Sequence, residues 1–213
     1  MARRQNAVGD IFHGDCAESY TARRAAGKAW SLENAALERM ISGLPTGLRV
    51  LDAPFGAGRF VDLYRARDMQ ITGLDISQAM LDAAVRECGA RLDGCRLDAG
   101  SADALPYPDD SFDLVVSFRF LSGIVDSRTA LASMREFARV SPRAILQLKC
   151  RPEALEPAEP PAPTAKLSKN YFRRDMDSLF ASTGWRIETS EQIDSDPRGE
   201  RWAFEVSRMQ DAR

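Results

Sequence analysis

Two acidic residues on either side of a pair of glycines form the part of this sequence best suited to chemistry. Asp52 ends a short apolar run, and Gly56 and Gly58 follow it at once. Asp75 ends a second apolar run about 20 residues later, where an acidic residue commonly hydrogen-bonds ribose hydroxyls in nucleotide-binding proteins. Because glycine has no Cβ, a ligand can approach the backbone closely. The spacing predicts a nucleotide site.

Phosphate-binding patterns are excluded by the glycine spacing. The string G-x-x-x-x-G-K-[ST] does not occur, and G-x-G-x-x-G fails because Val61 stands where the third glycine would follow Gly56. In the register that begins two residues earlier, Pro54 and Arg59 occupy glycine positions. What remains is D-x-P-x-G-x-G, with Asp52 before the turn. A carboxylate at that place favours a ligand with a positive charge over a pyrophosphate.

Apolar and helical patterns predict the elements that must position these residues. Strands are expected at 48–51, 71–75, 96–98, 112–118, 143–150, 185–193 and 202–209, with a polar loop at 194–200. Helices are expected at 32–44, 60–67, 78–87 (with Ser77 as N-cap), 129–139 and 171–183, the last stopped by Gly184. Strands that alternate with helices predict an α/β fold with a doubly wound, Rossmann-like, seven-stranded sheet that is mostly parallel.

Three stretches in this order resemble the class I S-adenosylmethionine (SAM) dependent methyltransferases. They are VLDAPFGAGRF (50–60), ITGLDISQAML (71–81) and ADALPYPDDSFDLVVS (102–117). The chain looks most like the small-molecule methyltransferase type 11 group, which includes relatives of the ubiquinone and menaquinone methyltransferases. The resemblance is good over 48–150 and loose elsewhere. It implies one domain with a helical cap (1–47), a SAM-binding core (48–150), a proline-rich loop or lid (151–170) and a C-terminal helix and hairpin (171–213) that adds one antiparallel strand.

The resemblance assigns cofactor roles to individual positions. Asp52 and the main chain of Pro54, Gly56 and Gly58 would hold the methionine end of SAM, and Asp75 would take both ribose hydroxyls. The remaining positions would flank the adenine, contact its edge or face the sulfonium: Ile76, Met80, Ser101, Ala102, Ser117 and Phe118. The product would be S-adenosylhomocysteine (SAH).

This chain departs from the family pattern at three places. Pro54 replaces the first glycine; it loses the N–H but keeps the carbonyl acceptor that a ligand ammonium needs. Ser101 stands where many relatives have Asp, so we expect weaker adenine selectivity. Relatives often carry a histidine pair near Ser122 and Gly123, and its absence here excludes a histidine mechanism at that point.

The N-terminal segment 11–30 is expected to cover the crevice beyond the strand ends. Relatives place a Tyr and an Arg over the SAM carboxylate, which suggests Tyr20 with Arg23 or Arg24. The alternative is a surface helix with solvated arginines. His13, the single histidine, is a weak candidate base because of its titration range, with a structural or exposed role as the alternative.

Two further regions could line the acceptor side. Arg119 follows the fourth strand, and a cation beside a sulfonium is unfavourable, so its side chain should point toward a substrate anion or a helix C-terminus. An ion pair with Asp126 or Asp113 is the alternative. The proline-rich stretch 151–170 is either a substrate-side lid or disordered.

Composition restricts the class of protein. The net charge of −2 and the pI near 5.6, with basic residues interleaved with acidic ones, argue against a nucleic-acid partner. No apolar run approaches the ~20 residues of a membrane span, and the four cysteines form no C-x-x-C pair, so we expect no membrane partner and no metal. A cytoplasmic monomer or homodimer that acts on a small molecule is expected.

The predicted reaction is methyl transfer from SAM to a small organic acceptor by in-line displacement. Positioning and exclusion of water suffice for much of such a reaction, so the catalytic residues are not identified, and His13, Tyr20 and Arg119 are only weak candidates. One alternative is an RNA or protein methyltransferase, with a basic face built from separated arginines. Another is a protein that binds or consumes SAM without transferring methyl.

Overall fold

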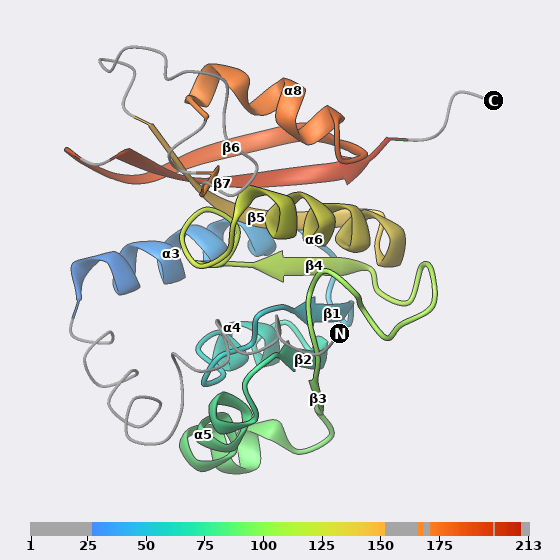
Figure 1. Ribbon diagram of the computed structural model, residues 1–213. Helices are drawn as coiled ribbons and strands as arrows, with labels where there is room; N and C mark the ends of the chain where they lie inside the picture. Colours follow the sequence, from blue (N-terminus) through green and yellow to red (C-terminus); the bar gives the residue numbers. More distant parts are fainter. Residues whose placement is uncertain (1–26, 152–165, 168–170, 198, 210–213) are drawn as a thin grey trace.

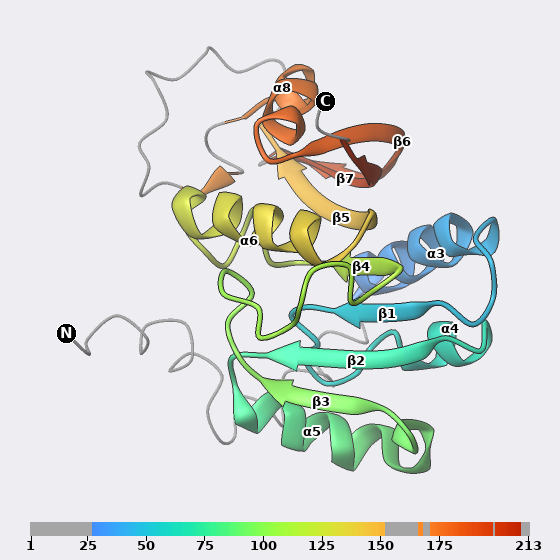
Figure 2. The ribbon, with the colours of Figure 1, turned by 90° about the vertical axis from the view of Figure 1, so that its right-hand side faces the viewer.

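Seven strands form one mixed sheet in the computed structural model, which describes residues 27–151, 166–167, 171–197 and 199–209. The strand order is β3-β2-β1-β4-β5-β7-β6, and β7 alone runs against the other strands. The bounds are β1 Arg49–Asp52, β2 Gln70–Asp75, β3 Arg96–Ala99, β4 Leu114–Ser117, β5 Arg143–Cys150, β6 Trp185–Asp196 and β7 Gly199–Arg208. The predicted doubly wound sheet with one antiparallel strand is confirmed (Figures 1 and 2).

Helices cover both faces of the sheet. They are α3 Lys28–Ser42, α4 Val61–Arg65, α5 Gln78–Cys88, α6 Ser127–Val140 and α8 Met176–Ala181, with short 3₁₀ turns η2 Gly89–Leu92 and η3 Arg173–Asp175. Side chains of a strand alternate between faces. Leu114 and Val116 of β4 accordingly pack in the core under α3, α4 and α5, whereas Val115 packs in the core under α6 and α8. Burial on both faces explains why β4 reads as one continuous apolar run.

Local signals set where several helices begin. Ser77 accepts a hydrogen bond from the backbone N–H of Met80 (3.4 Å) and caps α5 as predicted. Asp126 accepts from the backbone N–H of Thr129 (2.8 Å) and caps α6. Such caps satisfy backbone donors that have no partner within the helix. The loop from β4 to α6 therefore has a defined end.

The C-terminal region differs from the sequence prediction in its element lengths. The helix expected over 171–183 is reduced to η3 and α8, although Gly184 stops it with a φ of +88°. The prediction of a loop over 194–200 was wrong, because β6 runs to Asp196 and β7 begins at Gly199. A Cβ at Gly199 would lie 2.3 Å from the carbonyl oxygen of Cys150, so glycine permits the polar strands to pair up to a short turn.

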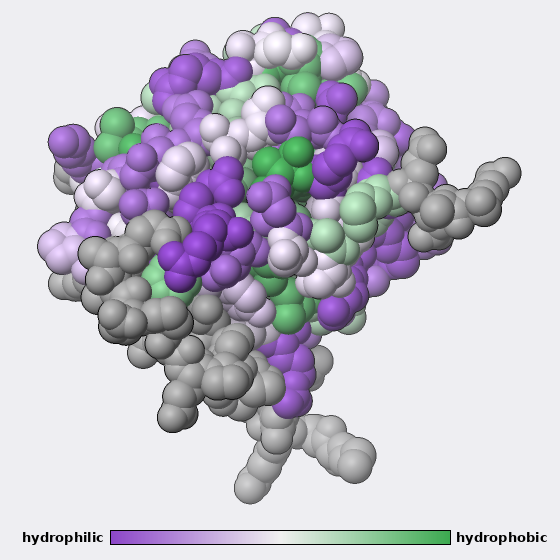
Figure 3. Space-filling view, turned by 90° about the horizontal axis from the view of Figure 1, so that it is seen from above, coloured by the Kyte–Doolittle hydropathy of each residue, from purple (hydrophilic) through white to green (hydrophobic). Residues whose placement is uncertain are grey.

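The surface seen from above is largely polar, with apolar side chains in small separate groups (Figure 3). Among the helices of the described residues, none has the length and apolar character needed to cross a membrane. The division of the chain at 47, 150 and 170 stays a prediction. Most of the N-terminal cap and of the proline-rich stretch lies outside the described residues.

Candidate functional site

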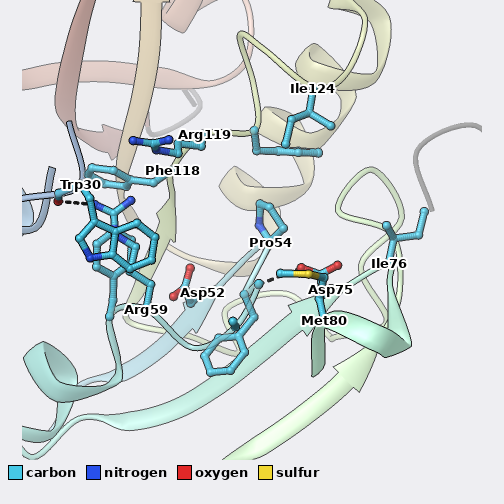
Figure 4. A pocket seen from close by; sticks show the side chains of 15 residues that line it. Trp30, Asp52, Pro54, Arg59, Asp75, Ile76, Met80, Phe118, Arg119 and Ile124 are labelled. Carbon is cyan, nitrogen blue, oxygen red and sulfur yellow. Dashed lines mark hydrogen bonds between the residues drawn. The ribbon is translucent and has the colours of Figure 1, made fainter. Parts of the chain in front are cut away.

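A cavity opens at the carboxyl ends of β1, β2 and β4 (Figure 4). The space between its walls is about 820 Å³ with the open solvent at its mouth included. The strand order changes direction between β1 and β4, and in open α/β sheets ligands bind at such a point. The cavity is thus where the strand-end residues of the sequence prediction converge.

Asp52 lies at the floor of this cavity with 2% of its surface exposed. Its carboxylate accepts a hydrogen bond from the Tyr64 hydroxyl (3.1 Å), and within the described part of the chain no cation forms an ion pair with it. Burial raises the pKa of Asp52 well above its ordinary value, although the Tyr64 hydroxyl and the charge of Arg59 act in the opposite direction. A buried carboxylate in this state gains stabilisation from a ligand that brings its own positive charge.

Asp75 lies on the other side of the cavity, at the end of β2. Its two oxygens accept from the backbone N–H groups of Gly56 (2.8 Å) and Ser77 (2.9 Å). Burial raises the pKa of Asp75, while these backbone hydrogen bonds lower it. Each carboxylate oxygen has a second lone pair, so Asp75 can still accept from two hydroxyl groups of a ligand.

The two glycines of the turn have different roles. Gly56 lines the cavity and adopts a φ of +57°, a conformation that glycine tolerates without cost from a side chain. Gly58 lies outside the cavity lining and has a φ of +76°. A Cβ on Gly58 would lie 2.7 Å from the Cys88 sulfur, so this glycine permits close packing of α5 rather than direct contact with the cavity.

A cluster of charged residues at the mouth of the cavity was missed by the sequence analysis. Glu33 of α3 is fully buried, and one of its oxygens accepts from Arg59 (2.6 Å) and from Arg119 (2.6 Å). The Arg59 guanidinium also lies against the rings of Trp30 (4.1 Å) and Phe60 (4.6 Å). These residues come from α3, the turn after β1 and the end of β4, so no local sequence spacing could have indicated the cluster.

The predicted site residues divide into three groups. Those that line the cavity are Asp52, Pro54, Gly56, Asp75, Ile76, Met80, Phe118 and Arg119. Those that do not are Gly58, Ser101, Ala102 and Ser117. The others, His13, Tyr20, Arg23 and Arg24, lie outside the described residues, although Trp30 from the same N-terminal segment does line the cavity.

The predicted site residues outside the cavity lining are hydrogen-bonded to a neighbour or buried in the fold. Ser101 donates to the Asp103 carboxylate, and Ala102 is buried in the core under α6. Ser117 is fully buried, and its hydroxyl has no hydrogen-bond partner among the described residues. Their assigned contacts with adenine and the sulfonium stay predictions.

The residues that replace the family histidines are structural here. The Ser122 hydroxyl accepts from the backbone N–H of Lys149 (2.8 Å), which ties the loop after β4 to β5. Lys166, at the far end of the proline-rich stretch, donates to the Gly123 carbonyl (2.5 Å). The alternative ion pairs for Arg119 were wrong: Asp113 pairs with Arg49 and Asp126 caps α6, while Arg119 binds Glu33.

The part of the sequence that forms most of this cavity matches a known protein family. Residues 50–142 match the family described as "Methyltransferase domain". A demethylmenaquinone methyltransferase from Deinococcus radiodurans is 40% identical over 88 residues, which are 40% of this chain and 36% of that protein. The O-methyltransferase cnsE from Penicillium expansum is 31% identical over 103 residues, which are 47% of this chain and 37% of that protein. The matches thus span little more than a third of the length of these curated relatives.

Solved structures share the fold over nearly the whole chain. The magnesium protoporphyrin IX methyltransferase from Synechocystis PCC 6803, solved with bound SAM, matches with a TM-score of 0.67 at 19% identity. The match covers 96% of each chain. At this identity the similarity concerns the fold alone, and it extends beyond residues 50–142 to β5, β6 and β7.

Proposed function

We propose that residues 50–142, which match the family described as "Methyltransferase domain", form a class I, SAM-dependent methyltransferase domain, and that the protein transfers a methyl group from SAM to a small organic acceptor. The observation that supports the proposal most is the pair of buried carboxylates, Asp52 and Asp75, on opposite sides of one cavity. The pair is complementary to a ligand with an ammonium group at one end and a ribose diol at the other.

The side chains around the cavity fit SAM. Asp52 would hold the ammonium, which supplies the positive charge that this buried carboxylate lacks. Asp75 would accept from the ribose hydroxyls, and Ile76 and Met80, which line the same end of the cavity, would flank the adenine. Pro54 and Gly56 line the cavity as well, and their backbone would border the space between these two ends.

Positioning is the main contribution of this chain to the reaction. Bound SAM would supply a methyl group on a positively charged sulfur, so the protein needs only to align the acceptor and exclude water. Phe118, Phe120 and Ile124 form apolar walls above the strand ends and would exclude water there. Ser122 and Gly123 stand where relatives often carry histidines, so a proton of the acceptor would leave to a group other than these or to solvent.

Calorimetry with SAH tests the cofactor site. We expect micromolar binding to the wild-type protein, and Asp75→Ala should weaken it by more than about tenfold because hydrogen bonds to a charged group are lost. Asp93→Ala is the control, since Asp93 is an exposed acid outside the cavity lining. If concentrated wild-type protein releases no heat with either SAM or SAH, the proposal is wrong.

Product analysis separates methyl transfer from other uses of SAM. The protein is incubated with SAM and a panel of small acids, phenols and amines, and the nucleoside products are identified by mass spectrometry. Methyl transfer yields SAH together with an acceptor heavier by one methylene. Methylthioadenosine in place of SAH would instead indicate a lyase or cyclase and contradict the proposed reaction.

A further inference from the structure

Arg119 holds an unusual backbone conformation at the cavity. Its φ is +57°, and such values are uncommon for residues other than glycine, asparagine and aspartate. Its backbone N–H donates to the side-chain oxygen of Gln147 (2.7 Å), which is itself buried on β5. A strained conformation that neighbouring groups hold in place is found mostly at functional sites. The position of this arginine therefore calls for a functional explanation.

Within the described part of the chain, the Arg119 guanidinium is held from one side only. Its Nε donates to Glu33, and its side chain is 18% exposed. Among the described residues, no acceptor contacts its two terminal nitrogens, and Arg119 is part of the cavity lining (Figure 4). The terminal nitrogens of arginine form a planar fork that matches a carboxylate with two parallel hydrogen bonds.

Around Glu33, at this end of the cavity, the described residues bring two cations to one anion. The same Glu33 oxygen also accepts from Arg59, so one carboxylate serves two guanidinium groups. Arg59 donates further to the Asn34 side chain (2.8 Å) and to the Trp30 carbonyl (2.7 Å), which commits it to α3. Asp52 is assigned to the SAM ammonium, and the SAM sulfonium adds another cation. An anion beside Arg119 would relieve this repulsion.

Apolar side chains line the same cavity as Arg119. Phe118, Phe120 and Ile124 come from the same strand end and loop, and Pro54 of the turn after β1 lines the cavity with them. We propose that Arg119 binds the anionic group of the methyl acceptor, so the acceptor is a small carboxylate with an apolar body. This inference rests on the proposed function and names the substrate class of the same site. The methionine carboxylate of SAM is the other source of a carboxylate, and the experiment separates the two.

The test uses an isosteric pair of probes on protein saturated with SAH. The affinities of 3-phenylpropanoate and of its neutral amide, 3-phenylpropanamide, are measured by ligand-observed NMR. Arg119→Asn removes the charge with a residue that tolerates positive φ, and Arg119→Lys keeps the charge without the fork. Arg135→Gln on α6 is the matched control, because Arg135 is exposed and outside the cavity lining.

We expect the wild type and Arg135→Gln to bind the carboxylate at least about tenfold more tightly than the amide. Arg119→Asn should lose this preference while its SAH affinity stays within about twofold of wild type. A wild type that does not discriminate between the probes overturns the inference but leaves the proposed function intact. Loss of SAH affinity in Arg119→Asn overturns it as well, because Arg119 would then hold the methionine carboxylate.

Arg119→Lys keeps the proposal testable if Arg119→Asn does not fold. Thermal unfolding shows whether each variant folds, and in a folded Arg119→Lys the preference for the carboxylate should fall by about threefold or more as the fork is lost. If Arg119→Lys and a folded Arg119→Asn both keep the full preference for the carboxylate over the amide, the assignment of the acceptor anion to Arg119 is wrong. Failure of the wild type to bind SAH would contradict the proposed function itself.

Discussion

At the scale of single residues, the burial of the Asp52 carboxylate affects both the stability of the protein and its binding of a cation. Burial outweighs the stabilisation of this carboxylate by Tyr64 and Arg59, so its ionised form destabilises the ligand-free protein and would be stabilised by a ligand ammonium. Asp52→Asn should therefore weaken SAH binding by more than about tenfold, because a charge-assisted hydrogen bond is replaced by a neutral one. The same variant should unfold at a higher denaturant concentration than wild type. A variant with unchanged SAH affinity in calorimetry would exclude Asp52 from the ammonium site.

The same residue predicts how binding depends on pH. The pKa of Asp52 is raised in the folded, ligand-free protein, so its protonated form persists to higher pH than in an ordinary carboxyl group. The ammonium binds the ionised form. SAH affinity should consequently increase as the pH rises through the Asp52 pKa, with protons released on binding. Calorimetry in buffers of different ionisation enthalpy between about pH 5 and pH 8 measures both quantities, and Asp52→Asn should lose the dependence.

Individual site residues differ in how far the sequence could reveal them. Asp52 and Asp75 follow from short-range patterns, since each ends an apolar run that must be a strand. The roles of Glu33 and Arg59 depend on how α3 packs against the turn after β1, which no local pattern contains. Arg119 was recognised as a charge near the sulfonium, but its partner was wrong because that partner lies 86 residues away in the chain.

At the scale of elements, α3 joins the core of the fold to the site through Glu33. This carboxylate has no exposed surface, and it pairs with two arginines that are 10% and 18% exposed. Its removal would leave both guanidinium groups without their anion. Glu33→Ala should lower the free energy of unfolding by about 3 kcal/mol, as is typical when one partner of a buried ion pair is lost.

A second pair on α3 provides the control for that prediction. Arg39 pairs with Glu191 of β6, but 59% of the Arg39 side chain is exposed. Arg39→Ala should therefore change the stability by less than about 1 kcal/mol. Chemical denaturation of both variants measures the contrast. Equal effects would show that Glu33 contributes no more than a surface charge does.

The N-terminus of α6 ends the loop that carries Arg119, Phe120 and Ile124. Asp126 caps it, and the hydrogen bond from the Thr129 backbone holds the pKa of Asp126 below its ordinary value. An acid with a lowered folded-state pKa stabilises the fold above its unfolded pKa and loses that contribution as the pH falls through the folded value. Asp126→Ala should cost about 1 kcal/mol near neutral pH and less in acid. A cost that is independent of pH in urea titrations would contradict the capping role.

Most elements of the sheet could be predicted from the sequence, and the reasons are physical. Strands β1, β2, β4 and β5 are buried on both faces, so each is a run of apolar residues between polar boundaries. The mutually antiparallel strands β6 and β7 were both predicted, but β6 was expected to end too early, at residue 193, and β7 to begin too late, at residue 202. Their polar ends pair through the backbone and through the ion pair of Arg201 with Asp194, which hydropathy does not register.

At the scale of the whole molecule, the site depends on the order of the strands. β1 lies between β2 and β4, so the loops after these three strands meet at one edge of the sheet (Figure 1). The other half, β5, β7 and β6 with α8, adds the large aromatic core around Phe180, Trp185 and Phe204 and does not line the cavity. Within this half, β5 supports Arg119, because the Gln147 side chain accepts a hydrogen bond from the Arg119 backbone N–H.

Ligand binding at this edge should therefore stabilise the molecule as a unit. A ligand that binds only the folded state at about 100 times its dissociation constant adds about 2.7 kcal/mol, which for a domain of this size raises the melting temperature by about 5–10 °C. SAH should produce this shift in thermal unfolding of the wild type, and Asp52→Asn and Asp75→Ala should reduce it at the same concentration. Adenosine, which lacks the ammonium that Asp52 would bind, should give a much smaller shift. An equal shift with adenosine would show that the methionine end of the ligand contributes nothing, and the role assigned to Asp52 would then be wrong.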